Sequence, residues 1–246
     1  LALLLLCLAT AAIGEEVVAG LSQNRISIST DFDGSEILIF GAVKRETARP
    51  PSDPLQVIIT VAGPSEPLTV RRKDRRFGIW INTDAVEVDR APSFYAVSTS
   101  APWREVIKDV EDLRHRISIQ RAIRSVGASI TGSRDFTNAL IRIRSGNGLY
   151  QTNIGAVQLE EQTLFSTGIR LPANLTEGDY KARFFLTRDG SVIDTYETTI
   201  AVQKVGLERF LFRLSRDEPL LYGLMSLAIA IAAGWGASAM FRLFRN

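Results

Sequence analysis

Residues that commonly carry enzymatic chemistry are scarce in this chain of 246 residues. It contains one cysteine, Cys7, and one histidine, His115. A hydrolytic triad needs a histidine or an equivalent base beside a nucleophile, and a zinc site needs several His or Cys ligands. His115 lies between Arg114 and Arg116 on a predicted helix, and neither a nucleophile beside it nor an S-x-x-K motif can be assigned. We therefore predict no catalytic residue, no metal site, no cofactor and no enzymatic activity.

The most conspicuous polar feature is the sequence RRKDRR at residues 71–76, which stands between two predicted strands. Its five cations would repel one another on one hairpin, so an anionic neighbour would stabilise them. That neighbour could be a lipid phosphate, an acidic patch on a partner protein or a small oxyanion, and a solvated turn is the alternative. The predicted anion- or partner-binding residues are Arg71, Arg72, Lys73, Arg75 and Arg76.

A second basic set could face the same partner. It consists of Arg114, Arg116, Arg121 and Arg124, and no glycine-rich phosphate loop accompanies either set. The net charge of +2 and the pI near 8.8 are too mild to indicate nucleic-acid binding. We predict no nucleic-acid partner.

The elements that must position these residues are mostly strands. Alternating polar and apolar residues, separated by turn signals, predict strands at 25–30, 36–40, 56–61, 77–82 and 94–99. Residues 103–124 change to helical periodicity, with a break near 117–118. Strand patterns return at 140–144, 164–171, 180–188 and 192–202, with a turn at Asp189-Gly190.

Residues 175–180 indicate the type of β fold. The sequence LTEGDY before a strand resembles the tyrosine corner of immunoglobulin-like sandwiches, in which a tyrosine hydroxyl bonds to upstream backbone. We predict a mainly β protein. It comprises two immunoglobulin-like β-sandwich modules, residues 15–101 and 126–204, joined by a linker helix at 102–125, and one C-terminal transmembrane helix.

Both ends of the chain are strongly apolar. Residues 1–14 have the length and composition of a signal peptide. A lipid anchor at Cys7 is the alternative, although Leu6 stands where a lipobox has a small residue. Residues 218–242 are long enough, at about 1.5 Å per residue, to span a bilayer as a transmembrane helix. Residues 243–246 then form the predicted cytoplasmic tail.

Charges near the span give a conflicting indication of topology. Lys204, Arg209, Arg213 and Arg216 precede the helix, which favours a cytoplasmic location for that side. A cleaved signal peptide would override this bias, because long folded domains are translocated largely regardless of charge. We expect a single-pass protein of the bacterial inner membrane, with the main body in the periplasm and the C-terminus in the cytoplasm.

Two sequence patterns indicate what the C-terminal anchor contacts in the membrane. Small residues recur every four positions in the span, which favours packing against another transmembrane helix, although small residues are also common in membrane spans generally. The segment 205–217 is amphipathic and predicts a helix lying in the membrane interface; a helical extension packed on the body is the alternative. The helix-packing residues are Ser226, Ala230, Gly234 and Ser238, and the membrane-interface residues are Leu207, Phe210, Leu211 and Leu214.

Several segments spread along the chain together resemble one family. They are FGIWIN at 77–82, APSFYAV at 91–97, EDLRHRISI at 111–119, LPANLTEGDY at 171–180 and VGLERFLF at 205–212, followed by the apolar span. The resemblance is to an alphaproteobacterial family of single-span transmembrane proteins, often encoded beside sulfite exporters of the TauE/SafE type. It implies an accessory subunit of such a sulfite or organosulfonate exporter, and no catalytic residues carry over from it.

The function expected from the sequence is therefore that of a non-enzymatic, membrane-anchored periplasmic accessory subunit. Its partners would be membrane lipid and a polytopic transporter of the TauE/SafE type. The alternative is a membrane-tethered sensor or scaffold of the cell envelope without a transport role. A sensor would need a concave pocket with converging polar groups.

Overall fold

The computed structural model describes residues 15–28, 34–44, 54–124, 133–204, 211 and 214–244. The predicted signal peptide at 1–14 and the predicted interface residues Leu207 and Phe210 lie outside these residues. The chain divides into two units, one comprising residues 1–26 and 32–202 and the other residues 27–31 and 203–246. The first holds the β body and the second holds the C-terminal helix.

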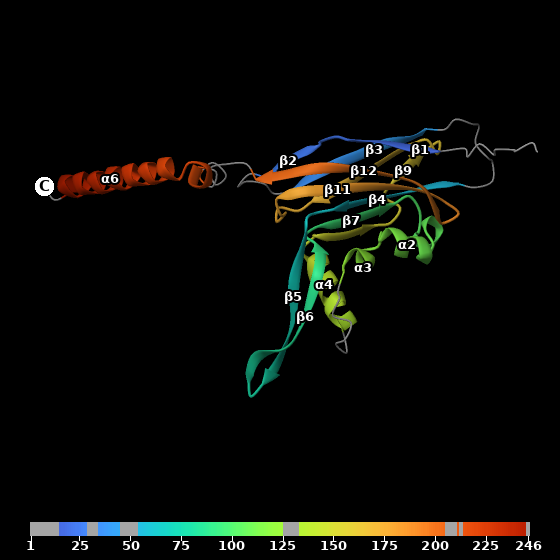
Figure 1. The fold of residues 1–246 in the computed structure, drawn as a ribbon, viewed down its shortest axis with the longest axis horizontal. Helices are drawn as coiled ribbons and strands as arrows, with labels where there is room; N and C mark the ends of the chain where they lie inside the picture. The colour runs from blue at the N-terminus through green and yellow to red at the C-terminus, as the bar shows by residue number, and fades with distance from the viewer. Residues whose placement is uncertain are drawn as a thin grey trace, which may run out of the picture. The chain divides into compact units, whose positions relative to one another are not determined.

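The body is built on two packed sheets and one separate hairpin (Figure 1). The four-stranded sheet has the order β1 (Glu16–Leu21), β3 (Ser35–Lys44), β10 (Leu164–Leu171) and β9 (Gln158–Glu160). The six-stranded sheet has the order β2 (Arg25–Ile28), β12 (Ser191–Lys204), β11 (Gly178–Arg188), β4 (Leu55–Ala62), β7 (Tyr95–Thr99) and β8 (Tyr150–Asn153). The hairpin joins β5 (Ser65–Arg76) to β6 (Ile79–Pro92).

The mainly β class is confirmed, but the chain is not divided into two successive β modules. Strand β3 pairs with β10, with Ile39 opposite Thr167, and β4 pairs with β11, with Ile59 opposite Phe184. Strands from both predicted modules therefore share the same two sheets and form one sandwich. Alternation within a strand determines which residues face inward, but it does not specify the neighbouring strand, which is why the sequence pattern missed this arrangement.

The core between the two sheets follows the alternation of the strands. On β3, Ile37 and Ile39 are buried, whereas Leu38 and Phe40 between and beyond them are about half exposed, at 50% and 46%. The rings of Phe165 from β10 and Phe184 from β11 meet across the sheets, with centroids 6.1 Å apart. One face of each sheet is thus covered by the other sheet.

Four short helices cover the second face of the six-stranded sheet (Figure 1). They are α1 (Trp103–Val106), α2 (Asp109–His115), α3 (Ile119–Ala122) and α4 (Ser133–Gly146). All lie between β7 and β8, which pair in parallel, and parallel neighbours need a crossover connection. Every residue of β7 is buried because the sheet is covered on both faces.

The predicted helix at 102–125 is present as three short helices, with a break where it was expected. Helix α2 ends at His115, and Arg116 adopts a left-handed conformation with φ 52°. The predicted strand at 140–144 is wrong, because these residues belong to α4. Leu140-Ile-Arg-Ile-Arg alternates like a strand, but the buried residues Phe136 and Leu140 have the i, i+4 spacing of a helix face.

The C-terminal helix α6 (Pro219–Phe244) confirms the predicted span. It includes one candidate membrane-spanning segment, Pro219–Ser238, none of which is buried. Residues 214–217 are also helical, and the Glu218 amide donates a hydrogen bond to the Leu214 carbonyl (3.1 Å). The interfacial location of the segment before α6 stays a prediction.

Candidate functional site

The basic cluster at residues 71–76 lies within strand β5, which corrects the prediction that it stands between strands. It occupies the outer half of the β5–β6 hairpin, which reaches away from the packed sheets (Figure 1). All of its residues are exposed. The turn itself is Phe77-Gly78, in which both residues have positive φ angles, 52° and 86°. This is the signature of a tight type I′ hairpin turn, for which asparagine or aspartate before glycine is the usual choice.

Two of the five cations in the cluster have carboxylate partners. The Arg72 guanidinium donates to Asp84 (2.9 Å from Nε) and lies over the Phe136 ring, 5.8 Å from its centroid. Arg76 lies 3.8 Å from Asp74. Among the described residues, no carboxylate lies within ion-pair distance of the other three cations, Arg71, Lys73 and Arg75. The outer hairpin therefore keeps an excess of positive charge facing solvent.

The end of this hairpin is apolar, a feature that the sequence interpretation missed. Phe77 is fully exposed, and Ile79, Trp80 and Ile81 are 64%, 68% and 39% exposed. Register places Trp80 opposite Arg75, and residues directly opposite in an antiparallel pair share a face. We call residues 71–81 the arm tip. The sequence signal was present: three consecutive apolar residues, 79–81, place apolar side chains on both faces of the strand.

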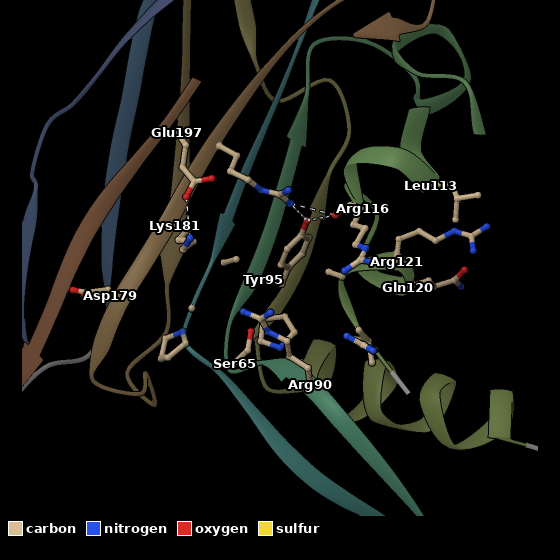
Figure 2. A pocket seen from close by; sticks show the side chains of 18 residues that line it. Ser65, Arg90, Tyr95, Leu113, Arg116, Gln120, Arg121, Asp179, Lys181 and Glu197 are labelled. Atoms are coloured by element: carbon tan, nitrogen blue, oxygen red, sulfur yellow. Dashed lines mark hydrogen bonds and ion pairs between the residues drawn. The ribbon is translucent and has the colours of Figure 1, made fainter. Parts of the chain in front are cut away.

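A separate basic pocket lies on the body, at the end of the six-stranded sheet beside α2 and α3 (Figure 2). It has a volume of about 690 Å³. Its two lining carboxylates are Asp179 and Glu197, and Glu197 is already paired with Lys181 at 3.0 Å. The lining cations, which define the basic pocket, are Arg90, Arg116, Arg121, Arg124, Lys181 and Arg183.

Tyr95 and Arg183 fix the wall of this pocket. The buried Tyr95 hydroxyl donates to the Ile117 carbonyl (2.7 Å) and accepts a hydrogen bond from Arg183 (3.3 Å). Arg183 also donates to the His115 carbonyl (2.9 Å) and the Arg116 carbonyl (3.2 Å). Burial raises the pKa of Tyr95 against the opposing charge of Arg183, so the phenol stays neutral and can donate. The sheet is thereby bonded to the end of α2.

The chain between α2 and α3 is held by a second set of bonds. The buried Asp112 carboxylate accepts from the Ile117 amide (3.1 Å), the Ser118 amide (2.7 Å) and the Ser118 hydroxyl (2.8 Å). These bonds fix the turn that contains Arg116, whose φ of 52° is uncommon for a residue with a side chain. The position of Arg116 at the pocket therefore follows from hydrogen bonds to the buried Asp112 carboxylate.

The second predicted basic set is only partly brought together. Arg116, Arg121 and Arg124 line the pocket, whereas Arg114 does not line it and pairs with Glu111 at 2.8 Å. The cluster at 71–76 does not line this pocket, so the two basic sets do not form one surface there.

His115 is held by contacts other than those of a triad. Its ring packs edge-on against Phe185, with centroids 5.7 Å apart, and its Nε2 lies 3.4 Å from Glu111 Oε2. Neither partner is a hydroxyl or a thiol. Within the part of the chain that the structure describes, no group of three His, Cys, Asp or Glu residues could hold a metal ion.

The predicted helix-packing residues lie on α6, where they are exposed. A Cβ atom added at Gly234, or at the nearby Gly236, would meet no atom within 4 Å. Ser226, Ala230, Gly234 and Ser238 follow one another at four-residue steps, so they share one side of the helix. Backbones of two helices can approach closely along such a side.

The sequence of the β body and of α6 together matches the model of a known family. The model of the family described as "Putative transmembrane protein (Alph_Pro_TM)" matches residues 16–243. The chain belongs to this family. The match covers both the β body and α6, which supports a membrane protein, and the described residues contain one candidate transmembrane helix, near the C-terminus. No curated protein matches the chain. The association with TauE/SafE-type exporters stays a prediction.

Proposed function

We propose that the protein is a non-enzymatic accessory subunit of a polytopic membrane transporter, anchored beside it by α6. The observation that carries this proposal is the helix itself. It is exposed along its candidate span, and its side of small residues has open space at Gly234. Lipid tails fit any apolar helix surface, whereas close backbone approach by another helix requires small residues. The occupant proposed for that side is a transmembrane helix of the transporter.

The arm tip supports a second contact with the same partner. It combines three cations that lack a carboxylate partner among the described residues with four exposed apolar side chains, and interfaces are enriched in aromatic residues and arginine. Phe77 and Trp80 are the largest of these side chains; Phe77 is in the turn and Trp80 is on the strand that follows it. We place them against a loop of the transporter that carries acidic residues.

The identity of the partner rests on the resemblance found in the sequence. It favours an exporter of the TauE/SafE type, with sulfite or an organosulfonate as cargo and the β body at its periplasmic mouth. The predicted signal peptide supports the periplasmic location of the body, and the predicted tail would then be cytoplasmic.

The direct test is affinity purification of the full-length protein from native membranes in mild detergent, followed by mass spectrometry of the co-purifying proteins. We expect one polytopic transporter in a fixed ratio to the protein. Recovery of the protein alone, from membranes in which the transporter is present, would contradict the proposal.

The basic pocket favours a second candidate function, that of a membrane-tethered sensor. A sensor needs a concave pocket with converging polar groups, and the pocket has six lining cations in about 690 Å³. A sensor would respond to its ligand without a stoichiometric transporter. The purification described above therefore separates the two functions.

A further inference from the structure

Two arginines of the basic pocket are held directly opposite each other. The Arg90 amide donates to the Arg124 carbonyl (3.1 Å), and the Arg124 amide donates to the Arg90 carbonyl (2.8 Å). The two residues thus form an isolated antiparallel bridge. In such a pair the Cα atoms are about 5.5 Å apart and both side chains leave on the same face. The backbone therefore places two cationic side chains opposite each other on one face.

Within the described residues, no carboxylate offsets the repulsion between these two arginines. Neither Arg90 nor Arg124 has a carboxylate within ion-pair distance there, and like charges opposite each other destabilise a β pair. Arg116 and Arg121, which line the same pocket, also lack such a partner in the described part of the chain. Four guanidinium groups thus border one cavity whose two lining carboxylates are Asp179 and Glu197, and Glu197 is already paired with Lys181.

The size of the cavity indicates a ligand larger than a bare ion. A volume of about 690 Å³ lies in the range of small-molecule pockets. Part of its wall is apolar, supplied by Ala62, Pro64, Leu113, Ala122 and Ile123. Guanidinium groups match phosphate and similar oxyanions because their planar donors can bind two oxygens at once.

We propose that the basic pocket binds a small organic anion through a phosphate or sulfonate group, which lies among the guanidinium groups of Arg90, Arg116, Arg121 and Arg124. The group would replace mutual repulsion with charge-assisted hydrogen bonds, and the rest of the ligand would contact the apolar wall. This inference does not depend on the transporter partner.

The test uses the full-length protein in detergent micelles and calorimetric titration with glycerol 3-phosphate. Glycerol is the uncharged control, and all titrations contain sodium chloride at the same ionic strength, because a nonspecific charge effect would be screened equally. We expect saturable binding of glycerol 3-phosphate and none of glycerol. Absence of saturable binding would overturn the proposal.

Variants locate the binding. We expect Arg90→Gln and Arg124→Gln each to weaken binding about ten-fold, the usual effect of losing one charge-assisted hydrogen bond. Arg104→Gln is the matched control, because Arg104 is an exposed arginine on α1 that does not line the pocket. We expect its affinity to stay within about two-fold of the wild type. Equal affinity in all three variants would overturn the assignment.

A second measurement keeps the test valid if a variant folds poorly. Removing one of two opposed cations should raise the melting temperature of the ligand-free protein, whereas Arg104→Gln should leave it unchanged. Arg90→Lys retains the charge but not the planar donors, so it should bind at an intermediate affinity. A lower melting temperature for Arg90→Gln than for Arg104→Gln would contradict the opposed-charge argument.

The same titration distinguishes two sources of the oxyanion. The protein is placed in nanodiscs of phosphatidylcholine alone or of phosphatidylcholine with phosphatidylglycerol. Loss of glycerol 3-phosphate binding in the anionic nanodiscs would identify a lipid headgroup as the ligand. Unchanged binding would identify a soluble organic anion. Absence of binding in both nanodiscs would overturn the proposal.

Discussion

The hydroxyl of Tyr95 donates a hydrogen bond to the carbonyl oxygen of Ile117 at 2.7 Å, which joins strand β7 of the six-stranded sheet to the segment between α2 and α3. The two residues are 22 positions apart, and both are buried. Because Arg183 donates to the same hydroxyl and to the carbonyl of Arg116, this bond belongs to the network that places the pocket arginines. The stability of the body and the geometry of the basic pocket are therefore linked.

We expect Tyr95→Phe to lower the free energy of unfolding by about 1–3 kcal/mol, because the Ile117 carbonyl is left buried without this donor. Urea unfolding of the full-length protein in detergent, followed by circular dichroism, measures the change. Tyr196→Phe is the control, since Tyr196 is 38% exposed and lies at the sheet surface. Equal stability of the two variants would show that the Tyr95 bond contributes nothing of its own.

Tyr180 makes the body sensitive to alkaline pH. Its hydroxyl donates to the Thr176 carbonyl (2.8 Å), and burial raises its pKa from 10.0 to about 12. The folded state therefore favours the neutral phenol. The resulting stability is fully present below pH 10 and is lost as the pH rises from about 10 towards 12.

We expect the unfolding midpoint to fall across this alkaline window and to fall less in Tyr180→Phe. The variant keeps part of the decline, because burial also raises the pKa of Tyr95 and of Tyr150. Urea titrations at intervals between pH 8 and about 12 give the comparison. A decline of equal size in the wild type and the variant would refute the assignment to Tyr180.

The hydrogen bond of the Tyr180 hydroxyl also shows which kind of feature the sequence predicts well. The stretch before Tyr180 indicated a hydroxyl bonded to upstream backbone, and the structure has that bond to Thr176. The turn at Asp189-Gly190 and the span at 218–242 were predicted for similar reasons. In each case the signal is carried by residues close together in the chain. Local backbone chemistry or local hydrophobicity is then sufficient to specify the structure.

The features that the sequence did not predict depend on residues far apart in the chain. The pairing of Arg90 with Arg124 joins β6 to the segment just after α3, and no local pattern marks it. No local pattern marks the pairing of β3 with β10 either, and this pairing joins the two predicted modules in one sheet. The basic pocket was missed for this reason, although three of its arginines belong to one basic set in the sequence.

The turn of the arm tip offers a test in which stability and interaction change in opposite directions. Asparagine adopts a positive φ more readily than phenylalanine, so Phe77→Asn should stabilise the protein or leave it unchanged, by an amount up to the order of 1 kcal/mol. Because the substitution removes a fully exposed ring, capture of the transporter from native membranes should fall several-fold. Ile154→Asn, at a residue 55% exposed elsewhere on the body, is the control. Equal capture of the transporter by both variants would show that Phe77 is not part of the interface.

The cations of the arm tip give an independent prediction. We expect the triple variant Arg71→Ala, Lys73→Ala and Arg75→Ala to retain wild-type stability, because all three side chains are exposed and lack carboxylate partners in the described chain. Transporter capture should fall, and the remaining capture should depend less on salt concentration. Capture is measured across a series of sodium chloride concentrations. A salt dependence identical to that of the wild type would mean that these cations do not face an acidic surface.

The most direct test of the accessory-subunit function compares two glycines of α6. Gly234 lies on the side of small residues, and Gly236, two residues further along, points to nearly the opposite side at about 100° per residue. Neither position has a neighbouring atom within 4 Å of an added Cβ, and the candidate span is not buried, so both positions have room to begin a larger side chain. Gly234→Leu and Gly236→Leu are purified from native membranes alongside the wild type, and the co-purifying transporter is quantified. We predict that the transporter is lost with Gly234→Leu and retained with Gly236→Leu. Equal recovery with both variants, or no transporter with the wild type, would contradict the proposed function.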